Sequence, residues 1–395
     1  MLDVEAVRRR FPALARPVAY LDGPGGSQVP DVVITAMRAH LERGVANDGG
    51  AFATSRETAE VVAAARAAAG ALTGSAPEEI AFGPNMTTLN FLLAHAVART
   101  LRPGDEIVVT QLDHDANVAP WVRVAEDHGL VVREAPIRPD GTLDPGDVEK
   151  VLSDRTRVVA FTLASNALGT VTDARRIAEA ARGAGALAWA DGVHYAPHRR
   201  PDRGALGVDV LLCSPYKVFG PHLGIAAIRS DLAETLPADR VRPASQTPSG
   251  RRFETGTPSF EALAGFTAAV DYLRSLGGGD LDAAYAAIRA HEEELARHAV
   301  DALGALDGVT VHGPRSVENR TPTFCLTVDG WAPRAVAERL ARVGIFCWDG
   351  DFYAPGPLRA LGLTDGAVRA GFLHYSTVDE VDRLAEALGA LRSER

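Results

Sequence analysis

The sequence predicts an α/β protein in which a large domain, built on a mostly parallel sheet covered by helices, precedes a smaller α+β domain. Strand-like apolar runs alternate with amphipathic helical segments through the first two thirds of the chain, as in parallel strands joined by helical crossovers. After about residue 258, two long helical segments lead into shorter strands. With 395 residues, 46 % of them hydrophobic, the chain is long enough for two cores.

The expected strands of the first region are continuous apolar runs, which is typical of strands buried on both faces. These strands are 106–110, 131–137, 157–164, 186–191, 208–213 and 224–229, with helices at 117–128 and 174–183. Polar or glycine-containing turns follow the strands, and open α/β sheets bind ligands at that edge.

The second region is expected to begin with two helices separated by three glycines, which indicate a helix end. Its helices are 260–276, 281–305, 332–342 and 378–392, and its strands are 309–312, 323–328, 344–348 and 368–376. We therefore place the large domain at 20–257 and the smaller one at 258–395 together with 1–19. Two loops are expected at 198–207 and 243–252, and the first, with 349–357, is expected to shape the ligand pocket.

Composition excludes several classes of protein. The 41 basic and 51 acidic residues give a net charge of −10, which argues against non-specific nucleic-acid binding. Three scattered cysteines, Cys213, Cys325 and Cys347, are too few for a disulfide framework or a zinc cluster, and no metal site is expected. No apolar run has the length of a membrane span, and the N-terminus lacks a signal-peptide pattern. We expect a cytoplasmic protein.

The lysine count points to one residue. Only two of the basic residues are lysines, Lys150 in a polar helical stretch and Lys217 between an apolar strand and a glycine-rich turn. An amine can form a Schiff base with a carbonyl compound, and a guanidinium cannot. Lys217 is therefore the candidate that could hold pyridoxal 5'-phosphate (PLP).

Such a site also needs a carboxylate for the ring nitrogen, an anion cradle for the phosphate and a group on the ring face. Asp191, at the end of a strand, could supply the carboxylate, although it could equally cap a following helix. Met86, Thr87 and Thr88 open an apolar helix whose N–H groups could bind the phosphate, or could simply be capped. His114 could face the ring, or be structural.

Taken in order, these segments resemble the class V aminotransferase family of fold-type I PLP enzymes, and within it cysteine desulfurase- or selenocysteine lyase-like proteins. The similarity runs from YLDGPGGSQVP (20–30) to VDEVDRLAEAL (378–388) and includes QLDHDANVAPW, WADGVHYAPH and SPYKVFGPHLG. The resemblance implies a PLP-binding large domain, an amino-acid substrate and a homodimer with both sites at its interface.

The resemblance also implies roles for individual residues. Lys217 matches the lysine that forms the Schiff base and later moves the substrate α-proton, and Asp191 the acid that keeps the ring nitrogen protonated. His114 matches the histidine stacked on the ring, and Asn166 the asparagine near the phenolic oxygen and the substrate. Arg369 matches the arginine that clamps the α-carboxylate, a bidentate role suited to guanidinium. The remaining cofactor contacts implied are Met86, Thr87, Ser214, His194, Tyr216 and, from a second subunit, Thr257.

Three positions depart from the desulfurase pattern. His194 replaces a glutamine, and Tyr216 replaces the histidine before the Schiff-base lysine. Alignment from Gly344 puts Tyr353 where the nucleophilic cysteine belongs, and a phenol cannot accept sulfur as a persulfide. Cys347 is close in sequence but lies in the apolar run IFCW, where a structural role is expected.

The expected chemistry is an external aldimine followed by α-proton removal. We expect a C–S β-elimination lyase without the usual nucleophilic cysteine, with Tyr353 or Tyr216 as a general acid. Transamination and epimerisation are alternatives from the same intermediate, and a non-catalytic PLP-fold binding protein is a second alternative. A nucleotide-binding enzyme is disfavoured, because no glycine-rich nucleotide motif follows a strand.

Overall fold

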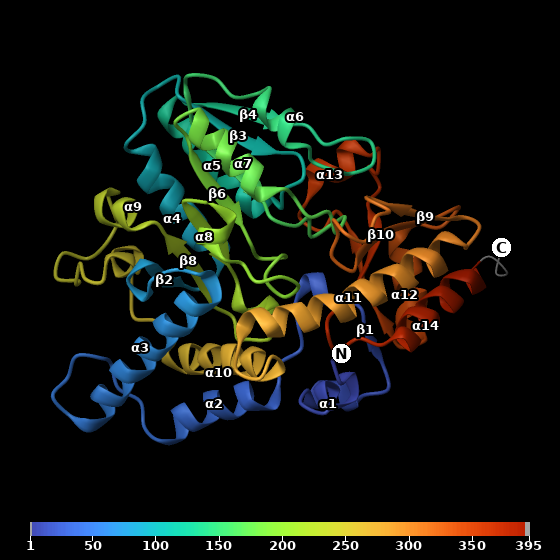
Figure 1. The fold of residues 1–395 in the computed structure, drawn as a ribbon, viewed down its shortest axis with the longest axis horizontal. Coiled ribbons are helices and arrows are strands. Elements are labelled where there is room, and N and C mark those ends of the chain that lie inside the picture. The colour runs from blue at the N-terminus through green and yellow to red at the C-terminus, as the bar shows by residue number, and fades with distance from the viewer. Residues whose placement is uncertain (1, 392–395) are drawn as a thin grey trace.

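The structure is a computed structural model and describes residues 2–391. Its largest feature is a seven-stranded sheet with the order β2-β8-β7-β6-β5-β3-β4 (Figure 1). Its strands are β2 (Ile80–Gly83), β3 (Glu106–Thr110), β4 (Val131–Ala135), β5 (Thr156–Thr162), β6 (Leu187–Asp191), β7 (Val210–Cys213) and β8 (Gly224–Ile228). Neighbouring strands are parallel, except that β8 is antiparallel to β2 and β7. The prediction of a mostly parallel sheet is confirmed, although the sequence pattern missed the short edge strand β2.

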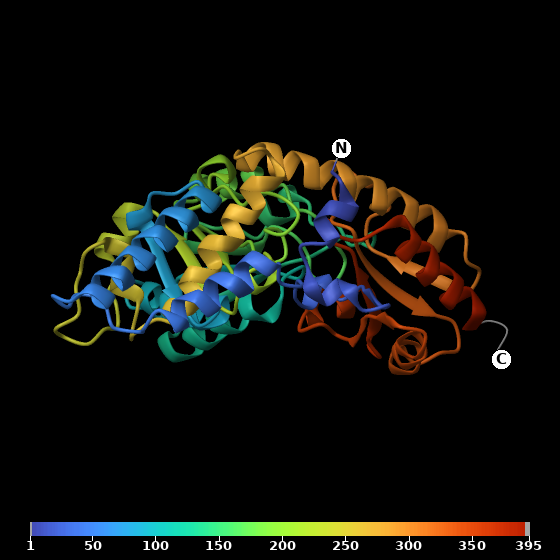
Figure 2. The same cartoon turned by 90° about the horizontal axis from the view of Figure 1, so that it is seen from below.

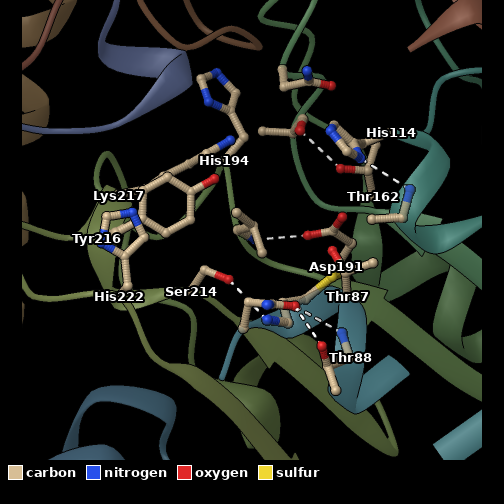
Figure 3. Close-up of a pocket in the computed structure, with 16 residues that line it drawn as sticks. Thr87, Thr88, His114, Thr162, Asp191, His194, Ser214, Tyr216, Lys217 and His222 are labelled. Atoms are coloured by element: carbon tan, nitrogen blue, oxygen red, sulfur yellow. Dashed lines mark hydrogen bonds between the residues drawn. The ribbon is translucent and has the colours of Figure 1, made fainter. Parts of the chain in front are cut away.

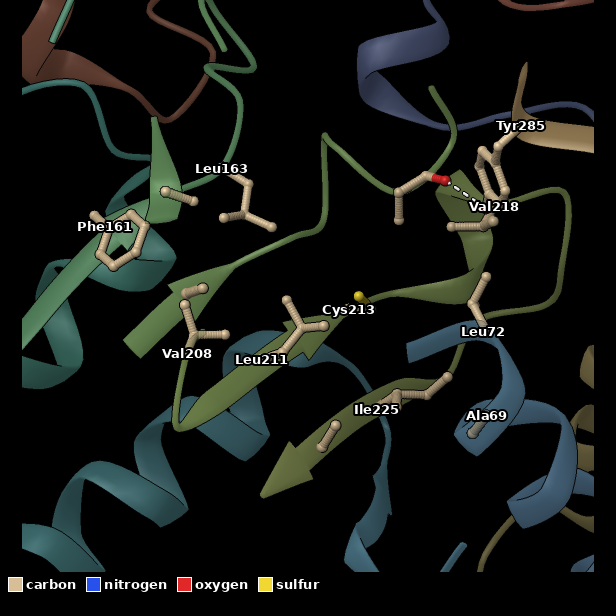
Figure 4. Close-up of a cluster of buried hydrophobic side chains, with 14 of the residues drawn as sticks. Ala69, Leu72, Phe161, Leu163, Val208, Leu211, Cys213, Val218, Ile225 and Tyr285 are labelled. Atoms are coloured by element: carbon tan, nitrogen blue, oxygen red, sulfur yellow. Dashed lines mark hydrogen bonds between the residues drawn. The ribbon is translucent and has the colours of Figure 1, made fainter. Parts of the chain in front are cut away.

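Helices cover both faces of this sheet. On β5, Val159 and Phe161 point to one face and Val158 and Ala160 to the other, so the strand is buried on both sides. Helices α3, α7 and α10 pack on the first face, part of which is shown in Figure 4, and α4 and α5 pack on the second. The helices up to α10 are α1 (Val4–Arg8), α2 (Asp31–Glu42), α3 (Ala53–Thr73), α4 (Met86–Ala98), α5 (Ala119–His128), α6 (Pro145–Glu149), α7 (Ala174–Gly183), α8 (Arg203–Leu206), α9 (Ser230–Thr235) and α10 (Phe260–Leu276).

The C-terminal part contains a four-stranded antiparallel sheet with the order β12-β13-β10-β9. Its elements are α11 (Leu281–Gly304), β9 (Val309–His312), β10 (Thr323–Val328), α12 (Pro333–Arg342), β12 (Trp348–Gly350), α13 (Pro355–Ala360), β13 (Ala367–Gly371) and α14 (Val378–Ala390). This smaller sheet and its helices enclose a separate hydrophobic cluster, which includes Leu21, Phe324 and Phe372. The α+β prediction for this part is confirmed, and the boundaries at 20 and 258 stay a prediction.

Helix α11 joins the two parts. Leu281, Tyr285 and Ile288 in its first half pack in the cluster on the first face of the large sheet. Leu295 and Leu303 in its second half pack in the cluster of the small sheet. Figure 2 shows this helix lying across both parts of the molecule. No helix within residues 2–391 is long and apolar enough to cross a membrane.

The predicted strand 344–348 is wrong as a single element. It is divided into β11 (Ile345–Phe346), which pairs in parallel with β1 (Ala19–Tyr20), and β12, which pairs with β13. Cys347 lies at the break. The division arises because Ile345–Phe346 pairs with β1 near the N-terminus, whereas Trp348–Gly350 pairs with β13.

Candidate active site

A cavity of about 560 Å³ lies where β5, β6 and β7 end, next to the first turn of α4. All of the predicted site residues line it except Tyr353, Thr257 and Arg369. The carboxyl ends of parallel strands meet at one edge of the sheet, and this brings together residues far apart in sequence. Figure 3 shows Lys217, Asp191 and His114 arranged around the same space.

The cavity holds one amine and one carboxylate, both buried. Lys217 lies just after β7 and is 5 % exposed, and Asp191 ends β6 and is 4 % exposed. Burial, aided by the charge of Arg369, lowers the pKa of Lys217 to about 7, although Asp191 opposes this shift. Burial also raises the pKa of Asp191 to about 6, against the N–H of Val193 at 2.8 Å and the charge of Lys217. A neutral amine is therefore accessible near neutral pH, as attack on an aldehyde requires.

The helix-cap alternative for Asp191 is excluded, because no helix starts within residues 192–202.

At the start of α4 the structure shows a cap, and the phosphate-cradle interpretation stays a prediction. Asn85 caps α4 by accepting hydrogen bonds from the N–H and hydroxyl of Thr88, at 2.8 and 3.0 Å. The Met86 N–H donates to Ser214 Oγ at 3.1 Å, which ties the helix start to the end of β7. Thr87 in the first turn of α4 and Ser214 after β7 both line the cavity.

Gly224 explains how closely β8 approaches this turn. A Cβ built at that position would lie 2.4 Å from the Asn85 carbonyl carbon, so any larger residue would displace the start of α4. A helix N-terminus with two hydroxyls beside it is a suitable site for a phosphate group.

His114 supplies a flat, uncharged surface. Its Nδ1 accepts the Ala116 N–H at 3.0 Å, and burial, followed by the charges of Lys217 and Arg369, lowers its pKa to about 3. The Tyr353 ring stacks on the imidazole with centroids 5.9 Å apart and planes at 26°. Tyr353 is 76 % exposed, so it lies on the rim beside His114 and does not line the cavity.

Arg369 reaches the same region from β13 of the small sheet. Its Nη1 donates to the Asn166 carbonyl oxygen at 3.1 Å, and its guanidinium carbon lies 4.7 Å from the Phe352 ring centre. The Asn166 side-chain amide donates to the Phe352 carbonyl oxygen at 2.9 Å. Two buried atoms, Arg369 Nε and Asn166 Oδ1, have no protein partner. A donor and an acceptor are thus available beside the cavity for a polar ligand such as an amino acid.

A buried hydrogen-bond network adjoins the cavity at Ala116. Asn90 of α4 donates to the Ala116 carbonyl oxygen at 2.8 Å and to Asn117 Oδ1 at 3.1 Å, and accepts the Trp189 indole N–H at 2.9 Å. Asn117 in turn donates to Asp113 at 2.8 Å. The network links α4, the turn that carries the ring-face histidine, and β6, which carries the acid.

Of the three positions that depart from the family pattern, His194 and Tyr216 line the cavity. His194 Nε2 lies within hydrogen-bond distance of the hydroxyls of Thr323 and Thr321, at 3.0 and 3.2 Å, and its Nδ1 has no partner. Tyr216 stacks on His222 with centroids 5.1 Å apart and planes at 6°. Sequence reasoning missed His222, although its position five residues after the lysine could have indicated it.

Two other segments that were expected at the active site, 198–207 and the one with Thr257, do not line this cavity. The expected loop at 198–207 is also partly helical, because 203–206 form α8. The ion pair of Arg203 with Glu79 at 2.6 Å holds α8 against the turn before β2. Thr257 is exposed and outside the cavity of its own chain.

The three cysteines do not line the cavity either. Cys213 and Cys325 are buried and Cys347 is partly buried. Burial raises the pKa of every one of these thiols, to about 12 for Cys325 and Cys347.

Residues 19–384 match the family described as aminotransferase class V. The chain belongs to the class V aminotransferase family. Its sequence is 33 % identical to a probable cysteine desulfurase of Mycobacterium leprae, over 99 % of this chain and 97 % of that protein. It is 32 % identical to an aminotransferase-like protein of Gibberella zeae, over 98 % of both. The structure resembles the apo form of a cysteine desulfurase of Thermococcus onnurineus, with a TM-score of 0.92, 26 % identity and coverage of 100 % and 99 %.

The protein is therefore a cysteine desulfurase-like, PLP-dependent enzyme of fold type I. The residues present fit the cofactor. Lys217 offers a neutral amine to its aldehyde, Asp191 a buried carboxylate to its ring nitrogen, and the start of α4 an anion site to its phosphate. His114 offers a flat neutral face to the ring.

Proposed function

We propose that the protein cleaves the C–S bond of a β-substituted α-amino acid by elimination, without a cysteine nucleophile. The observation that carries this proposal is that the cavity unites an amine, an acid and a nearby arginine but is lined by no cysteine. A desulfurase needs a thiolate to attack the substrate sulfur, whereas elimination needs a base and a proton donor.

Each residue of the site has a separate role in the elimination. Arg369 holds the substrate α-carboxylate through its guanidinium, whose Nε lacks a protein partner, and Asn166 offers its free Oδ1 beside the cofactor ring and the substrate. PLP, when bound, supplies an electron sink conjugated to the α-carbon. Lys217 removes the α-proton as a neutral amine, which its pKa of about 7 permits. Asp191 holds the ring-nitrogen proton in place.

The leaving sulfur takes a proton from a phenol. Tyr216 lines the cavity, its ring centre lies 5.8 Å from Lys217 Nζ, and burial raises its pKa, so the phenol keeps its proton. Tyr353 on the rim is the second candidate. With one water consumed, the products are a thiol, a keto acid and ammonium, and no persulfide forms on the enzyme.

We also propose a homodimer in which Thr257 reaches the cavity of a second copy. Large apolar side chains exposed on α2 and the segment after it, including Ile34, Leu41 and Phe52, support an interface there. Light scattering of the holoenzyme should give a dimer mass, and a fully active monomer would overturn this proposal. The cytoplasmic location stays a prediction.

The test mixes the PLP-loaded protein with L-cysteine and a panel of its S-substituted derivatives and measures thiol, keto acid and ammonium. We expect all three products in equal amounts. Lys217→Ala should reduce their rate about a thousand-fold. Lys150→Ala is the matched control, because that side chain is 74 % exposed and pairs with Asp147 at the surface.

Other outcomes would overturn the elimination proposal. A lasting conversion of the cofactor to its amine form would indicate transamination. Appearance of the D-isomer without keto acid would indicate epimerisation. Borohydride reduction followed by peptide mapping checks the cofactor site separately, because only two lysines can carry the label.

A further inference from the structure

A chain of buried polar groups leads away from the active-site cavity, starting at His194. This histidine lines the cavity and is 3 % exposed, and its Nδ1 has no partner. Its Nε2 contacts the hydroxyl of Thr321, which is itself 1 % exposed. Thr321 also lines a second cavity, so it connects the active-site cavity with that space.

Behind Thr321 is a second, much smaller cavity of about 10 Å³, lined also by His198, Glu292 and Arg320. That volume is the lower limit for one water molecule. His198 Nδ1 and Glu292 Oε2 are 2.8 Å apart, and both side chains are almost fully buried. His198 Nε2 and Glu292 Oε1 have no partner. The small cavity thus has polar walls with free hydrogen-bonding atoms.

The small cavity also adjoins the surface. Its wall includes Arg289 and Glu293, which form an ion pair on α11 with side chains 50 % and 32 % exposed. Groups able to carry protons therefore extend from the active-site cavity to the solvent side of α11.

The charges around the chain favour neutral histidine at its inner end. Burial lowers the pKa of His194 well below its usual value, and the charges of His198, Lys217, Arg369 and His114 add to this effect. A neutral imidazole can accept a proton at one nitrogen while it donates at the other.

Arg320 fixes the middle of the chain. Its guanidinium donates to the carbonyl oxygens of Thr321, Thr323 and Pro314, which holds the segment that presents both hydroxyls to His194. Burial lowers its pKa to about 10, so it remains charged near neutral pH. On the far side, the neighbouring titratable groups are His374, which feels the charge of His198, and Tyr285, which feels that of Glu292.

We propose that His194, Thr321, one water molecule in the small cavity and the Glu292–His198 pair form a proton relay between the active site and solvent. The inference rests on the proposed function, in which protons must enter and leave a buried cavity. In one passage a proton released in the active-site cavity bonds to His194 Nδ1, while Nε2 gives its own proton to the Thr321 oxygen. The Thr321 hydroxyl, which donates to the Gly169 carbonyl oxygen at 3.4 Å, passes its proton to the water, and a water proton passes to Glu292. Glu292, held by His198, then gives a proton to solvent water where the small cavity adjoins the surface, so each N–H or O–H bond formed is matched by one broken.

The test is a pH jump on the PLP-loaded full-length protein, followed by stopped-flow absorbance of the bound cofactor. Thr321→Val removes the hydroxyl and keeps the shape, and Thr321→Ser keeps the hydroxyl. We expect relaxation to slow about tenfold or more in Thr321→Val and Glu292→Gln and to stay near wild type in Thr321→Ser. Added imidazole should restore part of the lost rate. Equal rates in all of these proteins would overturn the relay.

A matched control lies on the same helix. His298 on α11 pairs with Asp382 at 2.6 Å, but the two side chains are 40 % and 50 % exposed and lie outside the small cavity. His298→Asn should relax at the wild-type rate. Equal slowing in this variant would indicate a general effect of changing α11 and would overturn the relay.

A crystal structure gives a readout that does not depend on the cofactor. We expect one ordered water between Thr321 and Glu292 in the wild-type protein, and a dry cavity would overturn the relay. The pH-jump readout requires no turnover, so it distinguishes the two proposals. Failure of the elimination proposal appears as missing thiol and keto acid from the wild-type protein, whatever the relaxation rates are.

Discussion

The two sides of the active-site cavity are built differently. On the cofactor side, Asn90 uses its donors and its acceptor within the protein, and Asn117 and Asp113 extend that network. On the substrate side, Arg369 Nε, from β13 of the small sheet, and Asn166 Oδ1, from the segment after β5 of the large sheet, are buried without protein partners. Buried polar groups are normally paired. The difference indicates that the Asn90 network is satisfied within the protein, whereas Arg369 and Asn166 offer buried polar atoms to a ligand.

The largest effect on activity is expected from a substitution of Arg369 on the substrate side. Arg369→Leu should lower kcat/KM by about a hundred- to a thousand-fold, because loss of one partner of a buried charge pair costs about 2–5 kcal/mol. Cofactor affinity should change less than kcat/KM, because Arg369 does not line the cofactor cavity and acts on Lys217 and His114 only through its charge. Steady-state kinetics and PLP titration measure the two effects.

Arg369→Lys sharpens this prediction. It keeps the charge but not the planar fork, so we expect an intermediate loss that falls mainly on KM. If both variants lose cofactor and substrate binding equally, the distinction between the two sides of the cavity is wrong.

Breaking the cofactor side should act on stability first. Asn90→Leu leaves the Trp189 indole N–H and the Ala116 carbonyl without their partner, and each unpaired buried group costs about 1–3 kcal/mol. We expect a lower free energy of unfolding in urea and weaker PLP binding together. Trp189→Phe removes the donor, leaves Asn90 Oδ1 unpaired and opens a void beside Trp121, so it should also lower both quantities. The exposed Asn319→Ala is the control and should match wild type. Loss of stability with unchanged PLP affinity would contradict a positioning role for the network.

The capture of PLP by the apoprotein should depend on pH. Because the pKa of Lys217 is lowered to about 7 from its ordinary value, the neutral amine is the major form above pH 7. Below pH 7 its fraction falls about tenfold per pH unit, so the capture rate should rise with pH up to about 7 and then level off. Stopped-flow absorbance checks this profile. A rate that still rises steeply near pH 10 would show an ordinary lysine.

Much of the cofactor side could be predicted from the sequence. Lys217 and Asp191 follow continuous apolar runs, and such runs predict the buried parallel strands whose ends form the cavity. Arg369 and Asn166 on the substrate side were named only through the family resemblance. The run 344–348 was predicted as one strand, because its pairing with residues 19–20 is visible only in the folded chain. Glu292 was not predicted either. In the sequence HEEEL it looks like part of a charged helix face, and its burial beside His198 depends on the packing of α11.

The smallest effects are expected on the rim. Tyr353 is 76 % exposed, so Tyr353→Phe should change the free energy of unfolding by no more than about 0.5 kcal/mol while it keeps the stacking on His114. If its hydroxyl protonates the leaving sulfur, thiol release should slow about tenfold with little change in KM.

Tyr216→Phe is the matched variant, because Tyr216 lines the cavity and its pKa is raised. A loss of rate in Tyr216→Phe alone would assign the proton to the cavity wall, and a loss in Tyr353→Phe alone would assign it to the rim. Unchanged thiol release in both variants would remove the phenols from the reaction and leave Lys217 itself as the donor, because it carries the abstracted proton.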